Sequence, residues 1–227
     1  MYRSYLLLLI VSITEIGLGQ SLQTLRLGQY RVGFSSSMAY DLSRPTMVDQ
    51  LGDTALDARA LQINLWYPSL QTDGYQEMRL NDYLMTEGEN PFFTGSKRDK
   101  ARKFYFRYNP EFVLYFDSLI ELNLAMNAYL AAPPSRGKFP TVILMHDGPT
   151  AFSVLAEYLA SHGYVVINFP VFGSEGILFD NQTNAVESEL RDIEFAVGYA
   201  KSLSYVDLDN LVLAGFSYGG FPLLRFR

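Results

Sequence analysis

The sequence contains no cysteine, which excludes disulfide bonds, thiolate metal sites and a cysteine nucleophile. It also lacks an excess of basic residues. The formal net charge is -6, whereas nucleic-acid binding needs a basic surface. Hydrophobic residues make up 48% and charged residues 19% of the chain, a composition typical of a globular protein. Only two histidines are present, His146 and His162, and this scarcity restricts the acid–base chemistry available to the chain.

The first residues have the pattern of a secretory signal peptide. Arg3 supplies a positive charge, an apolar run occupies residues 6–13, and small residues precede an expected cleavage site before Gln20. A buried strand or helix is the alternative interpretation. The apolar run is shorter than the roughly 20 residues that span a bilayer. We therefore expect residues 1–19 to be a signal peptide, the mature protein to be secreted or periplasmic, and no stable membrane anchor.

The first half of the remaining chain, residues 20–227, mixes two patterns. Residues 28–69 hold alternating stretches at 29–34 and 61–67 that predict strands. Residues 70–127 have helical tendency and predict a helical insert. The candidate helices of this insert are 75–89 and 97–123.

From residue 128 onward the pattern is regular. Phe152, Leu155 and Leu159 predict one face of a helix that Gly163 ends, and Asn184 predicts the N-cap of a second helix. Apolar strands are predicted at 128–132, 140–145, 164–168 and 211–214. Strands that alternate with helices through short loops predict right-handed crossovers and a parallel sheet. The predicted fold class is α/β.

The strongest catalytic pattern follows the last apolar strand, where residues 215–219 read Gly-Phe-Ser-Tyr-Gly. A strand that turns sharply into a helix holds its serine in a strained conformation, and the flanking glycines allow neighbouring segments to approach closely. The turn projects the Ser217 hydroxyl from the carboxyl end of the sheet, where α/β folds bind ligands. Ser217 is therefore the candidate nucleophile, and an ordinary turn with an idle serine is the alternative.

A serine nucleophile also needs two donors for the oxyanion that develops on the carbonyl. The backbone N–H of Tyr218, at the start of the following helix, is the first candidate. The loop after the 141–145 strand should supply the second. Pro149 has no N–H, so Gly148 is the better candidate there and Asp147 the next. A loop that only starts the helix is the alternative.

The chain resembles the secreted α/β-hydrolases of the dienelactone hydrolase and platelet-activating-factor acetylhydrolase type. The stretches that carry the resemblance are GQYRVGF (28–34), LQINLWYPS (61–69), GKFPTVILMHDG (137–148), LAEYLASHGYVVI (155–167), DIEFAVGYAKSL (192–203) and LVLAGFSYGGFP (211–222). The resemblance implies hydrolysis of esters, thioesters or lactones through an acyl-enzyme on Ser217, without a cofactor or metal. Dienelactone hydrolases use a cysteine, so the serine here is closer to the acetylhydrolase pattern.

The remaining members of a catalytic triad do not follow Ser217. In α/β-hydrolases an Asp or Glu and then a His come later in the chain, but residues 218–227 contain none of these. His146 is better explained by a role in the strand or loop, and His162 by a helix C-terminus, where its cation complements the helix dipole. Asp147 and Asp192 are also expected to be structural.

Two interpretations follow for residues 20–227. In the first, they are part of an α/β-hydrolase-like domain whose parallel sheet is incomplete at the C-terminus, with small acyl esters as substrates and no activity as this truncated chain. In the second, the protein is a secreted, non-catalytic binding module with a pocket near residues 104–116. Peptide hydrolysis is a third hypothesis, since HDGP at 146–149 is similar to a loop of prolyl-oligopeptidase-like enzymes.

Overall fold

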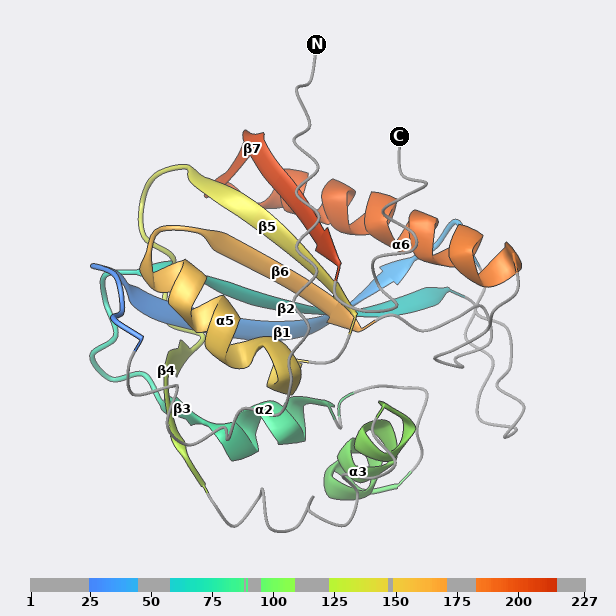
Figure 1. The fold of residues 1–227 in the computed structure, drawn as a ribbon, viewed down its shortest axis with the longest axis horizontal. Helices are drawn as coiled ribbons and strands as arrows, with labels where there is room; N and C mark the ends of the chain where they lie inside the picture. Colours follow the sequence, from blue (N-terminus) through green and yellow to red (C-terminus); the bar gives the residue numbers. More distant parts are fainter. Residues whose placement is uncertain are drawn as a thin grey trace.

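The computed structural model describes residues 25–44, 58–87, 89, 95–108, 123–146, 149–170 and 183–215. Within these residues the chain forms one mixed sheet with helices on both sides (Figure 1). The strands are β1 (Arg31–Asp41), β2 (Arg59–Ser69), β3 (Glu77–Arg79), β4 (Ala125–Leu130), β5 (Phe139–His146), β6 (Val165–Pro170) and β7 (Val206–Gly215). The helices are α2 (Leu80–Glu87), α3 (Lys97–Tyr108), α5 (Pro149–Ser161) and α6 (Thr183–Ser202).

The strand order in the sheet is β3-β4-β1-β2-β6-β5-β7. β5 pairs in parallel with both β6 and β7, whereas β2 runs antiparallel to β1 and to β6. The parallel half of the sheet comes from the regular strand–helix alternation, which confirms the predicted α/β class. The other half is mixed, because β1, from an alternating stretch near the N-terminus, pairs antiparallel with β2 and in parallel with β4.

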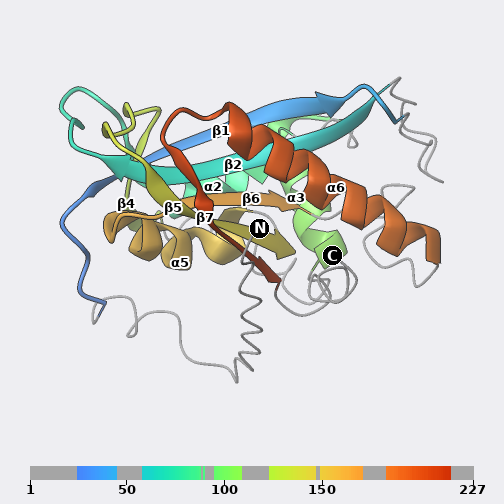
Figure 2. The same cartoon turned by 90° about the horizontal axis from the view of Figure 1, so that it is seen from above.

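α5 and α6 cover opposite faces of the sheet (Figure 2). On the α6 face, Ile63 of β2, Ile143 of β5 and Ile167 of β6 pack against Ile193 of α6. On the α5 face, Trp66 and Phe34 pack with Phe152, and Tyr83 of α2 joins the same cluster. Each face therefore has its own apolar core.

β2 is buried along its whole length, on both faces. Its alternation predicted a strand correctly, and the strand continues through Pro68 to Ser69. The polar residues in the alternation do not face solvent, because Gln62 and Asn64 are buried beneath the helices. These two side chains therefore need hydrogen-bond partners inside the protein.

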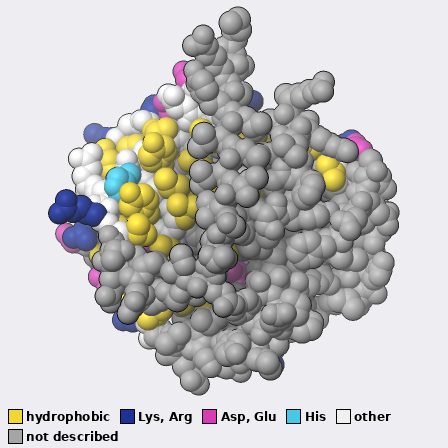
Figure 3. Space-filling view, viewed as in Figure 1, with side chains coloured by type: hydrophobic (Ala, Val, Ile, Leu, Met, Phe, Trp, Pro, Cys, Tyr) yellow, Lys and Arg dark blue, Asp and Glu magenta, His cyan; other side chains and the backbone are white. Residues whose placement is uncertain are grey.

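The buried face of α5 differs from the predicted one. Phe152, Ala156 and Ala160 are buried at a spacing of four residues, whereas the side chain of Leu155 is 45% exposed. The prediction that Leu155 lies on the core face is therefore wrong. Small residues face the sheet instead, and they allow the helix to approach it closely. On this side of the molecule apolar side chains are visible at the surface (Figure 3).

Other element boundaries shift modestly from their predicted positions. β3 and the start of β4 lie within the predicted helical insert, residues 70–127, together with α2 and α3, while 109–122 fall outside the described residues. α6 begins at Thr183, so Asn184 lies in its first turn and is not the N-cap. α5 ends as predicted, since Gly163 has a left-handed φ of 92° and its N–H bonds to the Ala160 carbonyl.

Candidate functional site

The carboxyl ends of β5, β6 and β7 meet at one edge of the sheet. Met145 of β5 lies opposite Phe169 of β6 on one side and opposite Gly215 of β7 on the other. In open parallel sheets this edge is where ligands bind, because the loops that leave the strands converge there. A functional site is therefore expected at this edge of the sheet.

The predicted site residues follow directly from these strand ends. Ser217 and Tyr218 come two and three residues after Gly215, and Gly148 comes two residues after His146. All three lie outside the described residues, as does Asp147. The structure thus brings together the ends of β7 and β5, the strands from which the nucleophile segment and the second donor segment leave. The geometry of the three residues themselves stays a prediction.

β7 contains an irregularity at residues 207–210, whose sequence Asp-Leu-Asp-Asn is typical of a turn. Pro140 is paired with Asp207, but the next residue, Thr141, is paired with Leu211. The Asp207 carboxylate accepts hydrogen bonds from the N–H of Asp209 (3.0 Å) and the Asn210 amide (2.8 Å), which stabilise the excursion. After it, residues 211–215 pair regularly with β5 and lead to the predicted nucleophile turn.

The first turn of α5 is held by a carboxylate from α2. The N–H of Thr150 donates to Oε1 of Glu87 at 3.2 Å, and Glu87 is only 1% exposed. The first N–H groups of a helix have no partner within the helix, so an acceptor here fixes where the helix starts. Sequence reasoning missed Glu87, because nothing in a short helix indicates which distant backbone its last residue meets.

A chain of polar side chains runs below the same edge, on the α5 face. The Asn168 amide donates to the Leu144 carbonyl (3.2 Å), and the Asn64 amide donates to Asn168 Oδ1 (3.1 Å). Ser36 donates to Asn64 Oδ1 at 2.7 Å. Gln62 donates to Ser36 Oγ (3.3 Å) and to the Thr86 carbonyl (2.9 Å). These residues replace apolar packing on the half of the α5 face that is nearest the edge.

A buried ion-pair cluster occupies the other face near this edge. Asp192 of α6 accepts from Arg44 Nη2 (2.8 Å) and from Arg59 Nη2 (2.7 Å). Arg44 also pairs with Asp41 at 2.6 Å, and the Arg59 N–H bonds to the Arg44 carbonyl. The cluster joins the end of β1 and the start of β2 to α6. This geometry agrees with the structural role expected of Asp192.

Glu189 lies one turn before Asp192 and is 2% exposed. Its Oε2 is buried and has no hydrogen-bond partner within the part of the chain that the structure describes. Burial raises the pKa of Glu189 to about 7, the charge of Asp192 adds to the increase, and Arg59 opposes it. The side chain is therefore partly protonated at neutral pH.

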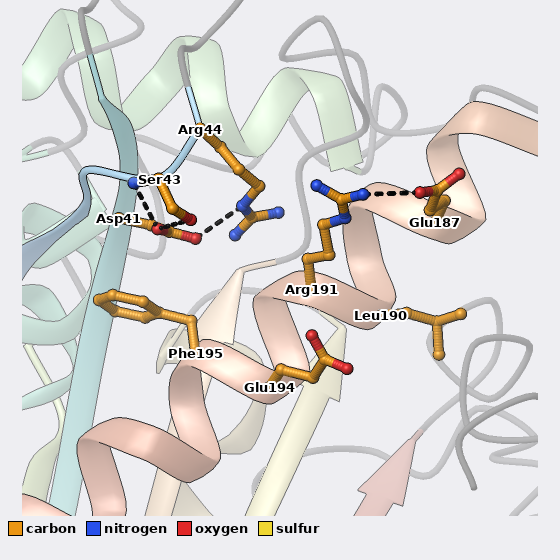
Figure 4. Close-up of a pocket in the computed structure, with 8 residues that line it drawn as sticks. All are labelled: Asp41, Ser43, Arg44, Glu187, Leu190, Arg191, Glu194 and Phe195. Carbon is orange, nitrogen blue, oxygen red and sulfur yellow. Dashed lines mark hydrogen bonds and ion pairs between the residues drawn. The ribbon is translucent and has the colours of Figure 1, made fainter.

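A surface depression of about 660 Å³ lies beside this cluster, between the end of β1 and α6 (Figure 4). Four of its charged groups form ion pairs, because Arg44 binds Asp41 and Arg191 binds Glu187 at 2.9 Å. It is lined by Asp41, Ser43, Arg44, Glu187, Leu190, Arg191, Glu194 and Phe195.

His162 lies at the opposite end of α5 from the edge. Its Nδ1 is 2.8 Å from the Tyr158 carbonyl and 3.2 Å from Ser161 Oγ, and its ring stacks near Tyr158. The position agrees with the expected role at a helix C-terminus. Among the described residues, no group of three or more His, Cys, Asp or Glu side chains could hold a metal ion, and no helix is long and apolar enough to cross a membrane.

Comparisons with known proteins agree with this architecture. A sequence model of the prolyl oligopeptidase family matches residues 150–224. The quorum-quenching protein AidA of Acinetobacter baumannii (strain MDR-ZJ06) is 33% identical over 101 residues, which are 41% of this chain and 33% of that protein. A Synechocystis protein (strain ATCC 27184 / PCC 6803 / Kazusa), named provisionally as a carboxymethylenebutenolidase, is 29% identical over 119 residues, 43% of this chain and 47% of that protein.

A ferulic acid esterase from Streptomyces cinnamoneus has a similar structure, with a TM-score of 0.59 at 19% sequence identity. The match covers 87% of this chain and 55% of the esterase. The chain thus spans about half of the length of that esterase and less than half of each of the two curated relatives. The strand order, the helices α5 and α6 on opposite faces of the sheet, and these matches show that the chain has an α/β-hydrolase fold.

Proposed function

We propose that the chain carries the nucleophile segment of a serine hydrolase that acts on carboxylic esters, thioesters or lactones. The observation that carries the proposal is the shared end of β5 and β7, where Met145 lies opposite Gly215. The Gly-x-Ser-x-Gly pattern follows this end of β7 directly. A turn at that place would present the Ser217 hydroxyl beside the segment that leaves β5.

In the proposed reaction Ser217 Oγ attacks the carbonyl carbon of the substrate while a base takes its proton. The N–H groups of Tyr218 and Gly148 would stabilise the resulting oxyanion. The C–O bond, or the C–S bond of a thioester, then breaks, and the leaving group takes the proton from the base. Water next loses a proton to the base and attacks the acyl-enzyme, and the C–O bond to Ser217 breaks as the serine regains a proton. Residues 218–227 supply neither the acid nor the base of a triad. We therefore expect Ser217 to be weakly activated in the 227-residue chain itself.

A small acyl ester is the substrate class that the relatives favour. The names of the matched proteins mention a carboxymethylenebutenolidase and a ferulic acid esterase. A lactone and an ester of ferulic acid can both be hydrolysed through an acyl-enzyme. Turnover of a series of esters that differ in their acyl group would identify the preferred acyl group.

A fluorophosphonate probe, which reacts with activated serines, tests the proposal. We expect little labelling of the 227-residue chain, and strong labelling of a longer protein in which the reading frame continues through an acid and a histidine. Ser217→Ala in the longer protein is the control and should abolish the label. If the longer protein stays unlabelled while folded, the catalytic assignment is wrong, and a non-catalytic binding module becomes the better interpretation.

Peptide hydrolysis is a second candidate, favoured by the match of residues 150–224 to the prolyl oligopeptidase family. Esters and amides would use the same serine and oxyanion donors, but an amine leaving group needs stronger acid assistance. Turnover of matched acyl-ester and acyl-peptide substrates by the longer protein separates the two. A preference for the peptide would assign the protein to the peptidases.

We also propose that residues 1–19 are removed on secretion, as their sequence pattern indicates. The intact mass of the protein recovered from the medium or the periplasm should correspond to a chain that starts at Gln20. Recovery of a chain that still begins at Met1 would contradict the proposal.

A further inference from the structure

The buried chain of polar side chains on the α5 face contacts both β5 and α5, the two elements on either side of the β5–α5 junction. At one end, the Asn168 amide binds the carbonyl of Leu144, two residues before the end of β5. At the other end, the Glu87 carboxylate binds the N–H of Thr150, in the first turn of α5. Residues 145–149 connect these two points. The polar chain therefore contacts the protein on both sides of the β5–α5 junction.

The links between the two ends are continuous. Asn168, Asn64, Ser36 and Gln62 are joined by side-chain hydrogen bonds of 2.7 to 3.3 Å, and Gln62 then donates to the Thr86 carbonyl at 2.9 Å. The residue after Thr86 is Glu87. Three strands and α2 thus contribute to one hydrogen-bonded path from β5 to α5.

Stability alone does not explain polar residues in this position. On the α6 face, the equivalent strand positions are filled by apolar side chains such as Ile63, Ile143 and Ile167. Buried amides that need several partners are less tolerant of movement than apolar side chains, because each lost partner costs the desolvation free energy of the group. Gln62 Oε1 has no hydrogen-bond partner among the described residues, but the linked amide donors tie the two ends of the polar chain to each other.

We propose that Glu87, Gln62, Asn64 and Asn168 are positioning residues that fix the β5–α5 junction for acyl transfer. The inference rests on the proposed function, in which this junction supplies the second oxyanion donor. None of the four touches the reacting atoms. Their effect is to set the end of β5 and the start of α5, between which the donor must be placed to within a fraction of an ångström.

The test compares two changes at Glu87 in the longer protein. Glu87→Ala removes the acceptor of the Thr150 N–H, and we expect fluorophosphonate labelling to slow by about tenfold or more. Glu87→Gln keeps an acceptor of the same shape and should label within about twofold of the unaltered protein. If Glu87→Ala does not fold, Gln62→Met, which breaks the chain at similar side-chain volume, takes its place with the same expectation.

Glu157→Gln is the matched control for a purely structural effect. Glu157 is also a buried carboxylate on the α5 face, but it binds the N–H groups of Asn127 and Ala128 at the far end of the helix. This variant should lose stability without slowing the labelling of the folded protein. Equal slowing by Glu157→Gln, or an unchanged rate in Glu87→Ala, would overturn the positioning role.

Amide hydrogen exchange separates this inference from the proposed function. In the 227-residue chain, Glu87→Ala should accelerate exchange of the Thr150 amide while the amides in the middle of α5 keep their protection. If the longer protein is never labelled but Thr150 responds in this way, the junction is fixed as inferred and only the catalytic assignment fails. If the Thr150 amide does not respond, the polar chain does not hold the junction and the inference is wrong.

Discussion

The two faces of the sheet bury their acidic groups in different ways. On the α5 face, Glu157 accepts hydrogen bonds from the Tyr83 hydroxyl (2.8 Å) and from the N–H groups of Asn127 (2.8 Å) and Ala128 (3.3 Å). On the α6 face, Asp192 lies between the guanidinium groups of Arg44 and Arg59. One carboxylate is thus held by neutral donors and the other by two full positive charges.

The difference follows from what each carboxylate joins. Burial raises the pKa of Glu157, while its hydrogen bonds to Asn127, Tyr83 and Ala128 oppose the increase. Burial and the neighbouring Glu157 raise the pKa of Tyr83, so its hydroxyl remains a donor. Neutral donors suffice where α5 is attached to β4. Charged partners are used where α6 is attached to the ends of β1 and β2, at the edge of the proposed site.

Removal of Asp192 tests whether the charged partners on the α6 face contribute more to stability than the neutral donors on the α5 face. Asp192→Ala removes the carboxylate that the buried Arg44 and Arg59 share, and the loss of one partner from a buried ion pair is among the most costly defects in a protein. We expect the free energy of unfolding to fall by about 3–5 kcal/mol. Urea denaturation followed by circular dichroism measures the loss. A change of less than about 1 kcal/mol would show that the cluster is more hydrated than its geometry indicates.

Removal of Glu157 should cost less, because only neutral donors lose their acceptor. Glu157→Ala leaves the N–H groups of Asn127 and Ala128 and the Tyr83 hydroxyl without this partner, and we expect a loss of about 2–4 kcal/mol. The same urea experiment applies. A cost that exceeds that of Asp192→Ala would reverse the ranking of the two faces.

Glu189 gives the α6 face a pH dependence. Its pKa is about 7 in the folded protein and near 4.5 when unfolded, so folding favours the protonated form and this contribution is lost as pH rises from about 4.5 through 7. Glu189→Gln removes the loss. Relative to the unaltered protein, the variant should gain stability from near zero at about pH 4 to about 1–3 kcal/mol at about pH 8.

Measurement of both proteins at the two pH values checks the sign as well as the size. Burial and the charge of Asp192 set this pKa difference, and the Arg59 charge already reduces it. A constant difference between the two proteins at all pH values would show that Glu189 does not titrate in this range.

The sequence predicted the parts of the fold that depend on local patterns. The apolar strands at 140–145 and 164–168 are almost the observed β5 and β6, and the pattern around residues 207–210 marks the excursion in β7. The Leu155 prediction failed because spacing alone does not show which of two faces meets the sheet. Small residues on the other side, such as Ala156, allowed closer packing.

The long-range polar contacts were beyond sequence reasoning. Glu87 and Thr150 are 63 residues apart, and Asn64 and Asn168 are 104 residues apart. In an alternating strand, polar residues such as Gln62 and Asn64 are expected to face solvent. The helices that cover them cannot be inferred from the sequence of one strand. The nucleophile segment was inferred from a local pattern, and it stays a prediction because it lies outside the described residues. The residues that hold the edge of the site in place are found only when the fold is known.

Removal of one partner of the exposed ion pair on α6 should give the smallest change in the free energy of unfolding. It is a reference for the changes expected at the buried groups. Arg191 and Glu187 pair at 2.9 Å, but both side chains are more than half exposed. Water and salt screen such pairs, so Glu187→Gln should change the free energy of unfolding by less than about 0.5 kcal/mol. The same helix thus carries a buried pair and an exposed pair that differ in solvent access. If Glu187→Gln cost as much as Asp192→Ala, burial would not be what makes the Asp192 cluster stabilising.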